Sequence, residues 1–251
     1  ALDAKHAVVI GGGALGLEAA WELRKEKMEV TVLEGMPRLL LGKLDDTAAD
    51  MLTKIAEKNG VNIQTGVKIA EITGNGKVDG VLLEDGTKTP ADIVLVSTGV
   101  RANKELAEDA GLLTNRAVMV SDKMQTSDSS VFAGGDCAEY DGANVAIWPV
   151  AMEMGRVAGA NAAGDSQPYL PQVQGMTLAA LNTMVYAIGD VGTKEGASYK
   201  TLEIRDDRKM TLQKCYFMNN ALCGAILIGD TSKMKEMTEG VLKKKAFHEI
   251  F

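Results

Sequence analysis

Three glycines near the start of the chain have the spacing of a phosphate-binding turn. In "VVIGGGALGLE" they follow the pattern G-x-G-x-x-G at Gly11, Gly13 and Gly16, after an apolar run and before a helical period. Gly11 allows a tight strand-to-helix turn, Gly13 lets the backbone approach a pyrophosphate, and Gly16 lets the helix pack close to the strand. The N–H groups of the following helix, which begins around Ala14 and Leu15, attract an anion. The spacing therefore predicts a diphosphate site.

An acid at the end of the second apolar run completes this pattern. The run "EVTVLE" ends at Glu34, where a carboxylate accepts both ribose hydroxyls of an adenosine. A carboxylate repels a 2′-phosphate and the following Gly35 and Met36 supply no cation, so the sequence favours NADH over NADPH. The order of strand, turn, helix, strand and acid favours a dinucleotide site over a glycine-rich turn in another α/β fold. Arg38 either contacts the adenosine end or only solvates its loop.

The elements that position these residues are predicted by alternating periods in the first hundred residues. Helical periods, "LGLEAAWELRKEK" and "DTAADMLTKIAEKNG", alternate with the short apolar runs "HAVVIG", "EVTVLE", "VNIQTG" and "ADIVLVSTG". This alternation is typical of a doubly wound parallel sheet. Between the last two runs, apolar and polar residues alternate across the turn pairs Asn75-Gly76 and Asp85-Gly86. That segment predicts a small antiparallel meander.

The remaining residues divide at a proline-containing joint, "SQPYLPQVQG". Before it, a helix, a short strand pair, a strand at "VFAGGD" and a final helix, "PVAMEMGRVAGANAAG", are expected. After it, the strands "YKTLEIR", "KMTLQKCYFM" and "ALCGAILIG" and a helix beginning near Asp230 predict a separate small α+β unit. The expected boundaries are therefore 1–100, 101–170 and 171–251.

Composition excludes several classes of partner. The 251 residues are 46% hydrophobic and 24% charged, enough for globular cores. A net charge of −7 with no basic stripe argues against a nucleic-acid partner, and no apolar run approaches a membrane span. Three cysteines without C-x-x-C spacing and two histidines give no metal-ligand pattern. We expect a soluble chain without a structural metal, in a reducing, cytoplasmic compartment.

The cysteines and methionines are interpreted as structural. Cys137 has no partner cysteine or histidine nearby in the sequence, so a small buried thiol is favoured over a redox-active one. If Asn219-Asn220 is a two-residue hairpin loop, position 216 pairs with 223 and 215 with 224. Cys215 and Cys223 then lie on opposite faces, and no disulfide is expected. The thirteen methionines are expected to fill core space.

Several segments carry a resemblance that covers nearly the whole chain. The segments "GGGALGLEAAWEL", "VTVLEGMPRLL", "VSTGVRANKELAEDAGL", "MQTSDSSVFAGGDCAE" and "WPVAMEMGRVAGANAAGD" resemble the pyridine-nucleotide flavin oxidoreductases. The similar branch contains NADH:rubredoxin reductases, NADH oxidases and the flavin part of assimilatory nitrite reductases. The resemblance implies an α/β fold with a Rossmann-like NAD-binding domain over 1–100. It further implies the C-terminal portion of an FAD-binding domain over 101–170 and a small α+β C-terminal domain over 171–251.

The resemblance also implies residues that meet FAD. The segment "TSDSSVFAGGD" is similar to the family's second flavin motif, in which Gly135 and Asp136 would meet the ribityl and pyrophosphate region. The helix that begins near Pro149 and Val150 would point its N-terminus at the flavin pyrimidine, where its dipole favours the anionic reduced flavin. Trp148 either walls the flavin ring or, more simply, lies in the core.

Two further positions match the family but have ordinary alternatives. Glu18 matches a position near the nicotinamide pocket, where it would hydrogen-bond the carboxamide or pair with a lysine on the flavin side; otherwise it is a plain exposed helix residue. Gly99 either permits close approach of a nucleotide to the strand end or is a turn glycine. The sequence lacks the C-terminal His-Pro and Glu pair that disulfide reductases use as acid and base.

The activity implied by the resemblance is electron transfer from NADH through FAD to a redox acceptor, such as a rubredoxin-like protein. One alternative is an NADH oxidase that reduces dioxygen. Another is a nucleotide-binding module without turnover, because the family's first FAD fingerprint is missing and the flavin site is incomplete. We expect that this segment belongs to a companion chain, or that truncation, proteolysis or gene splitting has removed it. No side chain is expected to act as a catalytic proton donor.

Overall fold

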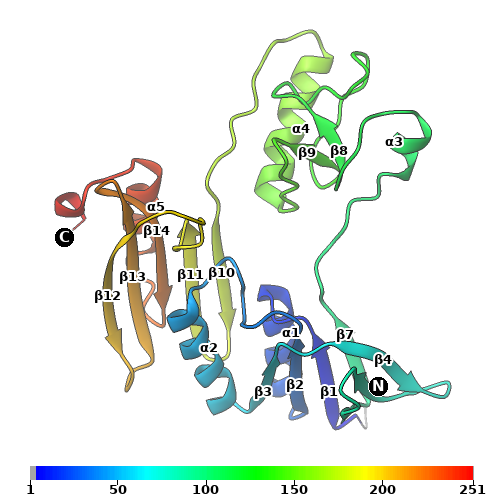
Figure 1. The fold of residues 1–251 in the computed structure, drawn as a ribbon, viewed down its shortest axis with the longest axis vertical. Helices are drawn as coiled ribbons and strands as arrows, with labels where there is room; N and C mark the ends of the chain where they lie inside the picture. Colours follow the sequence, from blue (N-terminus) through cyan, green and yellow to red (C-terminus); the bar gives the residue numbers. More distant parts are fainter. Residues whose placement is uncertain (1–3, 251) are drawn as a thin grey trace. The chain divides into compact units, whose positions relative to one another are not determined.

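A four-stranded parallel sheet carries the glycine turn (Figure 1). In the computed structural model, which describes residues 4–250, its strands run in the order β3-β2-β1-β7. Their bounds are β1 His6–Ile10, β2 Glu29–Glu34, β3 Val61–Thr65 and β7 Ile93–Val96. The helices α1 (Ala14–Lys25) and α2 (Asp46–Lys58) follow β1 and β2. The predicted Rossmann-like α/β arrangement is confirmed.

Strand β1 lies where the strand order reverses, with β2 on one side and β7 on the other. Its alternating side chains face two layers. Ala7 and Val9 pack with the helices, whereas Val8 and Ile10 pack with the opposite layer. Ligands of open α/β sheets bind beyond the carboxyl ends of the strands at such a reversal. The glycine turn, which begins at Gly11, occupies this position.

The opposite layer is the predicted antiparallel meander. Its strands are β4 (Ile69–Gly74), β5 (Val78–Leu83) and β6 (Lys88–Pro90), in the order β4-β5-β6. The turns contain Asn75-Gly76 and Asp85-Gly86, as the sequence predicts, and both glycines have positive φ. Val81 of β5 packs against the parallel sheet in one hydrophobic cluster, so the meander covers this face.

A five-stranded antiparallel sheet forms the C-terminal segment, in the order β10-β11-β14-β13-β12. Its elements are β10 Gly175–Ala180, β11 Thr183–Gly189, β12 Lys200–Asp206, β13 Thr211–Met218, β14 Ala221–Ile228, the helix α5 Met234–Leu242 and a 3₁₀ turn Phe247–Glu249. The sequence predicted three of these strands but not β10 and β11. Their turn, Leu181-Asn182, adopts positive φ at both residues without a glycine to signal it.

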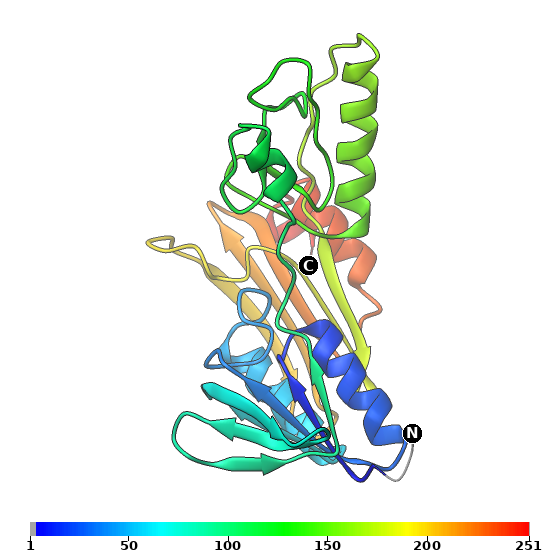
Figure 2. The same ribbon diagram turned by 90° about the vertical axis from the view of Figure 1, so that its right-hand side faces the viewer.

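The C-terminal sheet packs onto the parallel-sheet region. Ala1–Thr98 and Val173–Phe251 form one compact unit, and Gly99–Gln172 form another. Figure 2 shows α1 alongside β10, and one cluster joins Leu52 and Ile55 of α2 to Leu178 and Leu181 of the C-terminal segment. The predicted small C-terminal unit is present, and it packs closely on the parallel-sheet region. One face of its sheet completes this shared core, and the other face packs against α5.

An ion-pair cluster fixes the N-terminus of α2 to β13. Asp45 caps α2 by accepting a hydrogen bond from the Ala48 N–H at 2.9 Å. The same carboxylate pairs with Lys214 Nζ at 2.6 Å and accepts the Tyr216 hydroxyl at 2.7 Å. Lys214 also pairs with Glu203 of β12 at 2.8 Å. One half-buried carboxylate thus links a helix of the parallel-sheet region to the C-terminal sheet.

The second compact unit is built around α4 (Trp148–Ala162). Its other elements are α3 Glu105–Asp109 and the parallel pair β8 Val118–Val120 and β9 Ala138–Tyr140. The buried Glu139 carboxylate accepts from Asn115 Nδ2 at 2.9 Å and from the Arg116 N–H at 2.8 Å. The strand predicted at "VFAGGD" is wrong, because within the described residues only Phe132 pairs there, in an isolated bridge with Gln125.

The hairpin around Asn219 and Asn220 confirms the predicted two-residue turn, and both residues have positive φ. The predicted pairs beyond it are wrong, because a bulge moves Cys215 opposite Ala225. Cys215 and Cys223 still pack on opposite faces of the sheet, as predicted, and both are free cysteines.

Two predictions of burial fail in the second unit. Cys137 is exposed, because it follows the surface turn after Gly135, and its sulfur donates to the Gly134 carbonyl oxygen, 3.5 Å away. Among the methionines, Met154 fills the core as expected, but Met152 is 59% exposed on the outer face of α4. Hydrophobic character therefore does not fix burial in this part of the chain.

The Asp45 cluster predicts a pH-dependent contribution to stability. Burial tends to raise the pKa of Asp45, but hydrogen bonds from Lys214, the Ala48 N–H and Tyr216 outweigh it and lower the pKa. A lowered pKa stabilises the fold above the unfolded value of about 3.9, and this stabilisation is lost as pH falls through the folded pKa. We expect Asp45→Asn to lower the free energy of unfolding in urea at pH 7 by about 1–2 kcal/mol.

The difference between the two proteins should be smaller at pH 3 than at pH 7, because pH 3 lies below the unfolded pKa of about 3.9 and the stabilisation that comes from the lowered folded pKa is then partly lost. Asp50→Asn provides the control, because Asp50 forms an exposed pair with Lys54 on the same helix. Its effect should stay below about 0.5 kcal/mol. An Asp45→Asn effect that is equally large at both pH values would contradict the role assigned to the carboxylate charge.

Candidate functional site

The three fingerprint glycines have different surroundings. Gly11 has φ +114°, and a Cβ there would lie 2.2 Å from the Ser97 carbonyl oxygen beyond β7. A Cβ on Gly16 would lie 2.0 Å from the Gly11 carbonyl oxygen, so α1 packs directly on the turn. A Cβ on Gly13 would meet nothing within 4 Å. Gly11 and Gly16 are therefore required by packing, whereas Gly13 borders open space.

That open space lies at the N-terminus of α1. Gly13 is the N-cap residue, no side chain caps the helix, and its first turn contains no acid. The N–H groups of Ala14 and Leu15 belong to the first turn, where intrahelical acceptors are lacking. The Leu15 side chain is 74% exposed. This end of the helix has the free donors and the positive dipole that an anion requires.

Glu34 lies at the base of the same turn. Its Oε2 accepts the Gly12 N–H at 2.6 Å, and its Oε1 accepts the Met36 N–H at 2.7 Å. Two backbone donors thus hold the carboxylate beside the glycine turn, and each oxygen retains acceptor capacity for a hydroxyl. This is the position from which an acid contacts the ribose of a bound dinucleotide.

Sequence reasoning missed Gly12. A Cβ there would lie 2.6 Å from Leu39 Cδ2 and 3.1 Å from Glu34 Oε2. The missing side chain therefore lets Glu34 reach the turn. The run of three successive glycines, one more than the motif needs, was the available signal.

The two other candidates on this part of the chain, Arg38 and Glu18, differ in whether they have partners. Arg38 pairs with Asp46 at 2.9 Å and donates to the Leu44 carbonyl oxygen at 3.3 Å, so its guanidinium holds the loop before α2. This favours the loop role over the adenosine contact. Glu18 is half-buried on α1 and has no hydrogen bond or ion pair with another described residue. Its carboxylate remains available to a ligand.

Gly99, by contrast, is the first residue of the second unit. It has φ +92° and no heavy atom within 4 Å of a Cβ position. These features agree with a turn glycine.

The second unit contains the residues expected to meet a flavin. A Cβ on Gly134 would lie 3.0 Å from the backbone of Met154, and Gly135 has φ +83° beside Ala151. The two glycines therefore let the chain pack against α4. Asp136 follows with an exposed side chain, and its backbone carbonyl accepts Asn144 Nδ2 at 2.9 Å. The carboxylate is thus presented at the surface close to α4.

The N-terminus of α4 is also uncapped. Its N-cap residue, Ile147, makes no side-chain cap, and Pro149 occupies the first turn. Trp148 is 78% exposed, so the core position considered for it is wrong. The Val150 side chain is buried, which leaves only its backbone to face a ligand. Near this helix end, Val145, Ile147, Trp148 and Met152 form an exposed apolar surface.

Neither a metal-binding cluster nor a spanning helix occurs in the described part of the chain. Among residues 4–250, no three histidine, cysteine or acidic side chains are grouped so that they could hold a metal ion. No helix of this range is both long and apolar enough to cross a membrane. The predicted residues fall into two groups, the glycine turn with Glu34 in the first unit and Asp136 with α4 in the second.

The parallel sheet, the glycine turn and the carboxylate after β2 define a Rossmann-like α/β protein. Residues 1–155 match the family described as pyridine nucleotide-disulphide oxidoreductase, and residues 176–245 match the rubredoxin NAD+ reductase C-terminal domain. The chain belongs to the pyridine nucleotide-disulphide oxidoreductase family, in the branch of the rubredoxin and nitrite reductases. It is thus homologous to NAD(P)H-dependent flavoprotein reductases, which use FAD and NAD(P)H.

Curated relatives support this assignment. The chain is 32% identical over 246 residues to a nitrite reductase [NAD(P)H] of Bacillus subtilis, covering 98% of the chain and 30% of that protein. It is 32% identical over 196 residues to a rubredoxin-NAD(+) reductase of Pseudomonas putida, covering 73% of the chain and 51% of that protein. The chain therefore spans about a third to a half of the length of these relatives.

Solved structures show the same fold. An NAD-dependent persulfide reductase from A. fulgidus matches with a TM-score of 0.87 at 29% identity, over 98% of the chain and 50% of that structure. A ferredoxin reductase from Rhodopseudomonas palustris matches with a TM-score of 0.85 at 27% identity, over 97% of the chain and 61% of that structure.

The different surroundings of Gly13 and Gly16 predict different effects of adding one methyl group. Gly16→Ala should lower the free energy of unfolding by about 2–3 kcal/mol, because its Cβ overlaps the Gly11 carbonyl oxygen. Gly13→Ala should change it by less than about 1 kcal/mol, because its Cβ enters open space. Urea unfolding of both variants measures the difference. Equal destabilisation would contradict the packing described for the turn.

Proposed function

We propose that the first compact unit binds NADH, with its diphosphate at the N-terminus of α1 and its adenosine ribose at Glu34. The observation that carries this proposal is the open space at Gly13, which borders uncapped helix donors. The Glu34 carboxylate is held beside the same turn by the Gly12 and Met36 N–H groups. Glu18, which lacks a partner among the described residues, is the candidate contact for the nicotinamide carboxamide.

Selectivity for NADH over NADPH follows from the same carboxylate. Two backbone donors fix Glu34, so it cannot swing away from a 2′-phosphate without breaking both hydrogen bonds. The nearest cation in sequence, Arg38, is already paired with Asp46 and with the Leu44 carbonyl. A 2′-phosphate would therefore meet an anchored negative charge, and Arg38 is already engaged elsewhere.

The second compact unit would supply the C-terminal part of an FAD site. Exposed Asp136 would meet the ribityl and pyrophosphate region, with the Gly135 backbone beside it. The uncapped N-terminus of α4 offers donors and a positive dipole to the pyrimidine edge, and exposed Trp148 offers a ring face. These features fit a flavin. Since the chain spans only part of its relatives, completing this site requires a further segment, present as a companion chain or elsewhere in a longer protein.

The whole activity is then electron transfer from NADH through FAD to a redox acceptor, with a rubredoxin-like protein as the first candidate. The two cofactors supply the hydride transfer, and the residues of this chain bind and orient them and provide no proton donor. The match of residues 176–245 to the rubredoxin reductase C-terminal domain supports this acceptor class. The setting would be the reducing cytoplasm, which suits three free thiols.

A second candidate is reduction of dioxygen. It is favoured by 36% identity over 194 residues to an NADH oxidase of Methanocaldococcus jannaschii, which covers 74% of the chain and 41% of that protein. A nucleotide-binding module without turnover remains the alternative from another class. All three candidate functions share the NADH site. The module binds NADH without transferring its electrons, whereas the two enzymes pass the electrons to a protein or to dioxygen.

Calorimetry tests the nucleotide site directly. We expect saturable heat with NADH and binding of NADPH at least about tenfold weaker, because of the fixed carboxylate. Gly13→Ala should lower the affinity for NADH, because its Cβ enters the space assigned to the diphosphate. The unfolding midpoint should stay almost unchanged, because that Cβ meets no protein atom within 4 Å. Glu34→Gln should reduce the difference in affinity between NADH and NADPH, because it removes the negative charge that repels the 2′-phosphate. A folded chain that gives no heat with NADH would refute the proposal.

Visible absorption separates the enzyme from the module. After incubation with FAD and gel filtration, we expect a bound-flavin band that bleaches on addition of NADH without oxygen. Admitting air then distinguishes the two acceptors. Rapid recovery of the flavin band indicates that dioxygen is the acceptor, and slow recovery favours a protein acceptor. A chain that stays colourless but still binds NADH would favour the module.

A further inference from the structure

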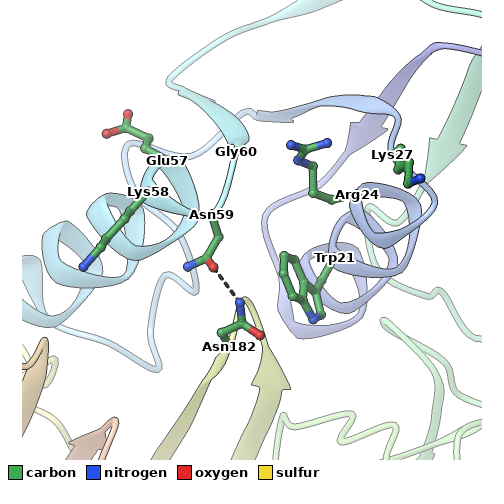
Figure 3. A pocket seen from close by; sticks show the side chains of 8 residues that line it. All are labelled: Trp21, Arg24, Lys27, Glu57, Lys58, Asn59, Gly60 and Asn182. Carbon is green, nitrogen blue, oxygen red and sulfur yellow. Dashed lines mark hydrogen bonds between the residues drawn. The ribbon is translucent and has the colours of Figure 1, made fainter.

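A hollow of about 500 Å³ lies at the end of α1 opposite the glycine turn (Figure 3). Trp21 and Arg24 lie eight and eleven residues beyond Gly13, which places the hollow about 12–16 Å along the helix from the turn. Trp21 of α1 faces Asn59 and Asn182 across it, and the Arg24 guanidinium packs against Gly60 at its edge. The hollow thus lies in the first compact unit, between the C-terminal ends of α1 and α2 and the turn that joins β10 to β11, and contains none of the residues assigned to NADH.

The side of the hollow formed by the β10–β11 turn is fixed in place. Asn59 Nδ2 donates to the Leu181 carbonyl oxygen at 3.0 Å and to the Ile55 carbonyl oxygen at 2.8 Å. Asn59 Oδ1 accepts Asn182 Nδ2 at 2.8 Å. Leu181 is completely buried, so the turn is anchored in the core as well. A surface held in this way binds a partner with little ordering cost.

Two adjoining hollows extend the surface around Asn182. One, of about 360 Å³, is lined by Lys58, Lys209 and Met210 among others. The second, of about 380 Å³, includes Trp21 and Met184. All three hollows share Asn182, so they surround the tip of the turn. A chain of shallow hollows around a fixed projection suits a polypeptide segment better than one enclosed small molecule.

The charge of this surface is opposite to that of the whole chain. Arg24, Lys27, Lys58 and Lys209 line the hollows, with Glu57 as the acid among them, although the net charge of the chain is −7. Within residues 4–250, none of these four cations forms an ion pair. The positive ends of these side chains are therefore free to attract a negative partner.

Neighbouring lysines on the same two helices, in contrast, form ion pairs. Lys25 pairs with Glu22 at 2.6 Å and Lys54 with Asp50 at 2.7 Å. Cations are favoured at helix C-termini, which accounts for Arg24 and Lys58 near the ends of α1 and α2. It does not account for Lys209, which comes from the turn between β12 and β13. The positive charge is gathered from three separate parts of the unit.

Two side chains in the first hollow keep N–H groups without acceptors among the described residues. The half-buried Trp21 has an indole N–H without an acceptor among the described residues. Arg24 uses Nη1 to donate to the Met28 carbonyl oxygen at 3.2 Å, and its side chain makes no other hydrogen bond with residues 4–250. An indole wall beside a free guanidinium edge suits a carboxylate carried on an aliphatic stem.

We propose that these hollows form a docking site for an acidic segment of a partner protein. Its carboxylates face Arg24, Lys58 and Lys209, and its backbone passes around the tip at Asn182. The site is independent of the proposed NADH function, because it shares no residue with it and lies at the other end of α1. A protein bound there is tethered to the reductase chain without covering its nucleotide site.

Fluorescence of Trp21 tests this proposal. The chain has two tryptophans, so in a Trp148→Phe background Trp21 is the reporter. Titration with a hexaglutamate peptide at low salt should give a saturable change in emission that weakens as salt is added. Lys58→Glu and Lys209→Glu should each weaken binding by about tenfold. Lys200→Glu, an equal charge change at an exposed residue of β12, should leave binding within about twofold.

Three outcomes would overturn the proposal. The first is a titration with the peptide that gives no saturable change in emission. The second is a loss of affinity in Lys200→Glu as large as in Lys58→Glu and Lys209→Glu. The third is a change in emission with pyrophosphate but not with the peptide, which would indicate a small-anion site. Circular dichroism and the unfolding midpoint of each variant establish that it is folded. If Lys58→Glu fails this control, Lys209→Glu decides, because its side chain comes from a turn outside α2.

Discussion

The nucleotide end of this chain depends on the contact between α1 and the turn below it. Gly16 lies so close to the Gly11 carbonyl oxygen that no side chain fits between them. This contact sets the first turn of α1 directly beyond the end of β1, where the strand order reverses. Gly12 extends the same constraint to the acid, because its N–H holds Glu34. Backbone packing therefore positions both the helix donors and the carboxylate.

A second set of contacts holds α2 at both ends. Asp45 at its N-terminus binds Lys214 and Tyr216 of β13, and Asn59 just beyond its C-terminus binds the turn at Leu181. The C-terminal sheet is thereby attached to the helix that also packs against the parallel sheet. These contacts keep the hollows around the β10–β11 turn in a fixed shape and place them away from the glycine turn.

Much of this arrangement could be predicted from local pattern. The glycine spacing with Glu34, the parallel strands and the Asn-Gly and Asp-Gly turns each rest on short-range backbone chemistry, which the sequence states directly. The failures depend on distant neighbours. The turn at Leu181 is stabilised by Asn59 rather than by a glycine, and Phe132 has too few strand partners in the described chain to extend a ladder. The exposure of Trp148 likewise depends on what packs beside α4, which periodicity does not encode.

The shared core imposes an order on biosynthesis. The first compact unit is assembled from Ala1–Thr98 and Val173–Phe251, with all of Gly99–Gln172 between them in the chain. The parallel sheet emerges from the ribosome before the C-terminal sheet, yet the hydrophobic cluster that contains Leu52 and Ile55 of α2 lacks its C-terminal members until Leu178 and Leu181 have been synthesised. The second unit must emerge during this interval. The half of the first compact unit that is made first therefore waits for the second half before its packing is complete, and in the meantime the uncovered face is the surface that a chaperone would meet.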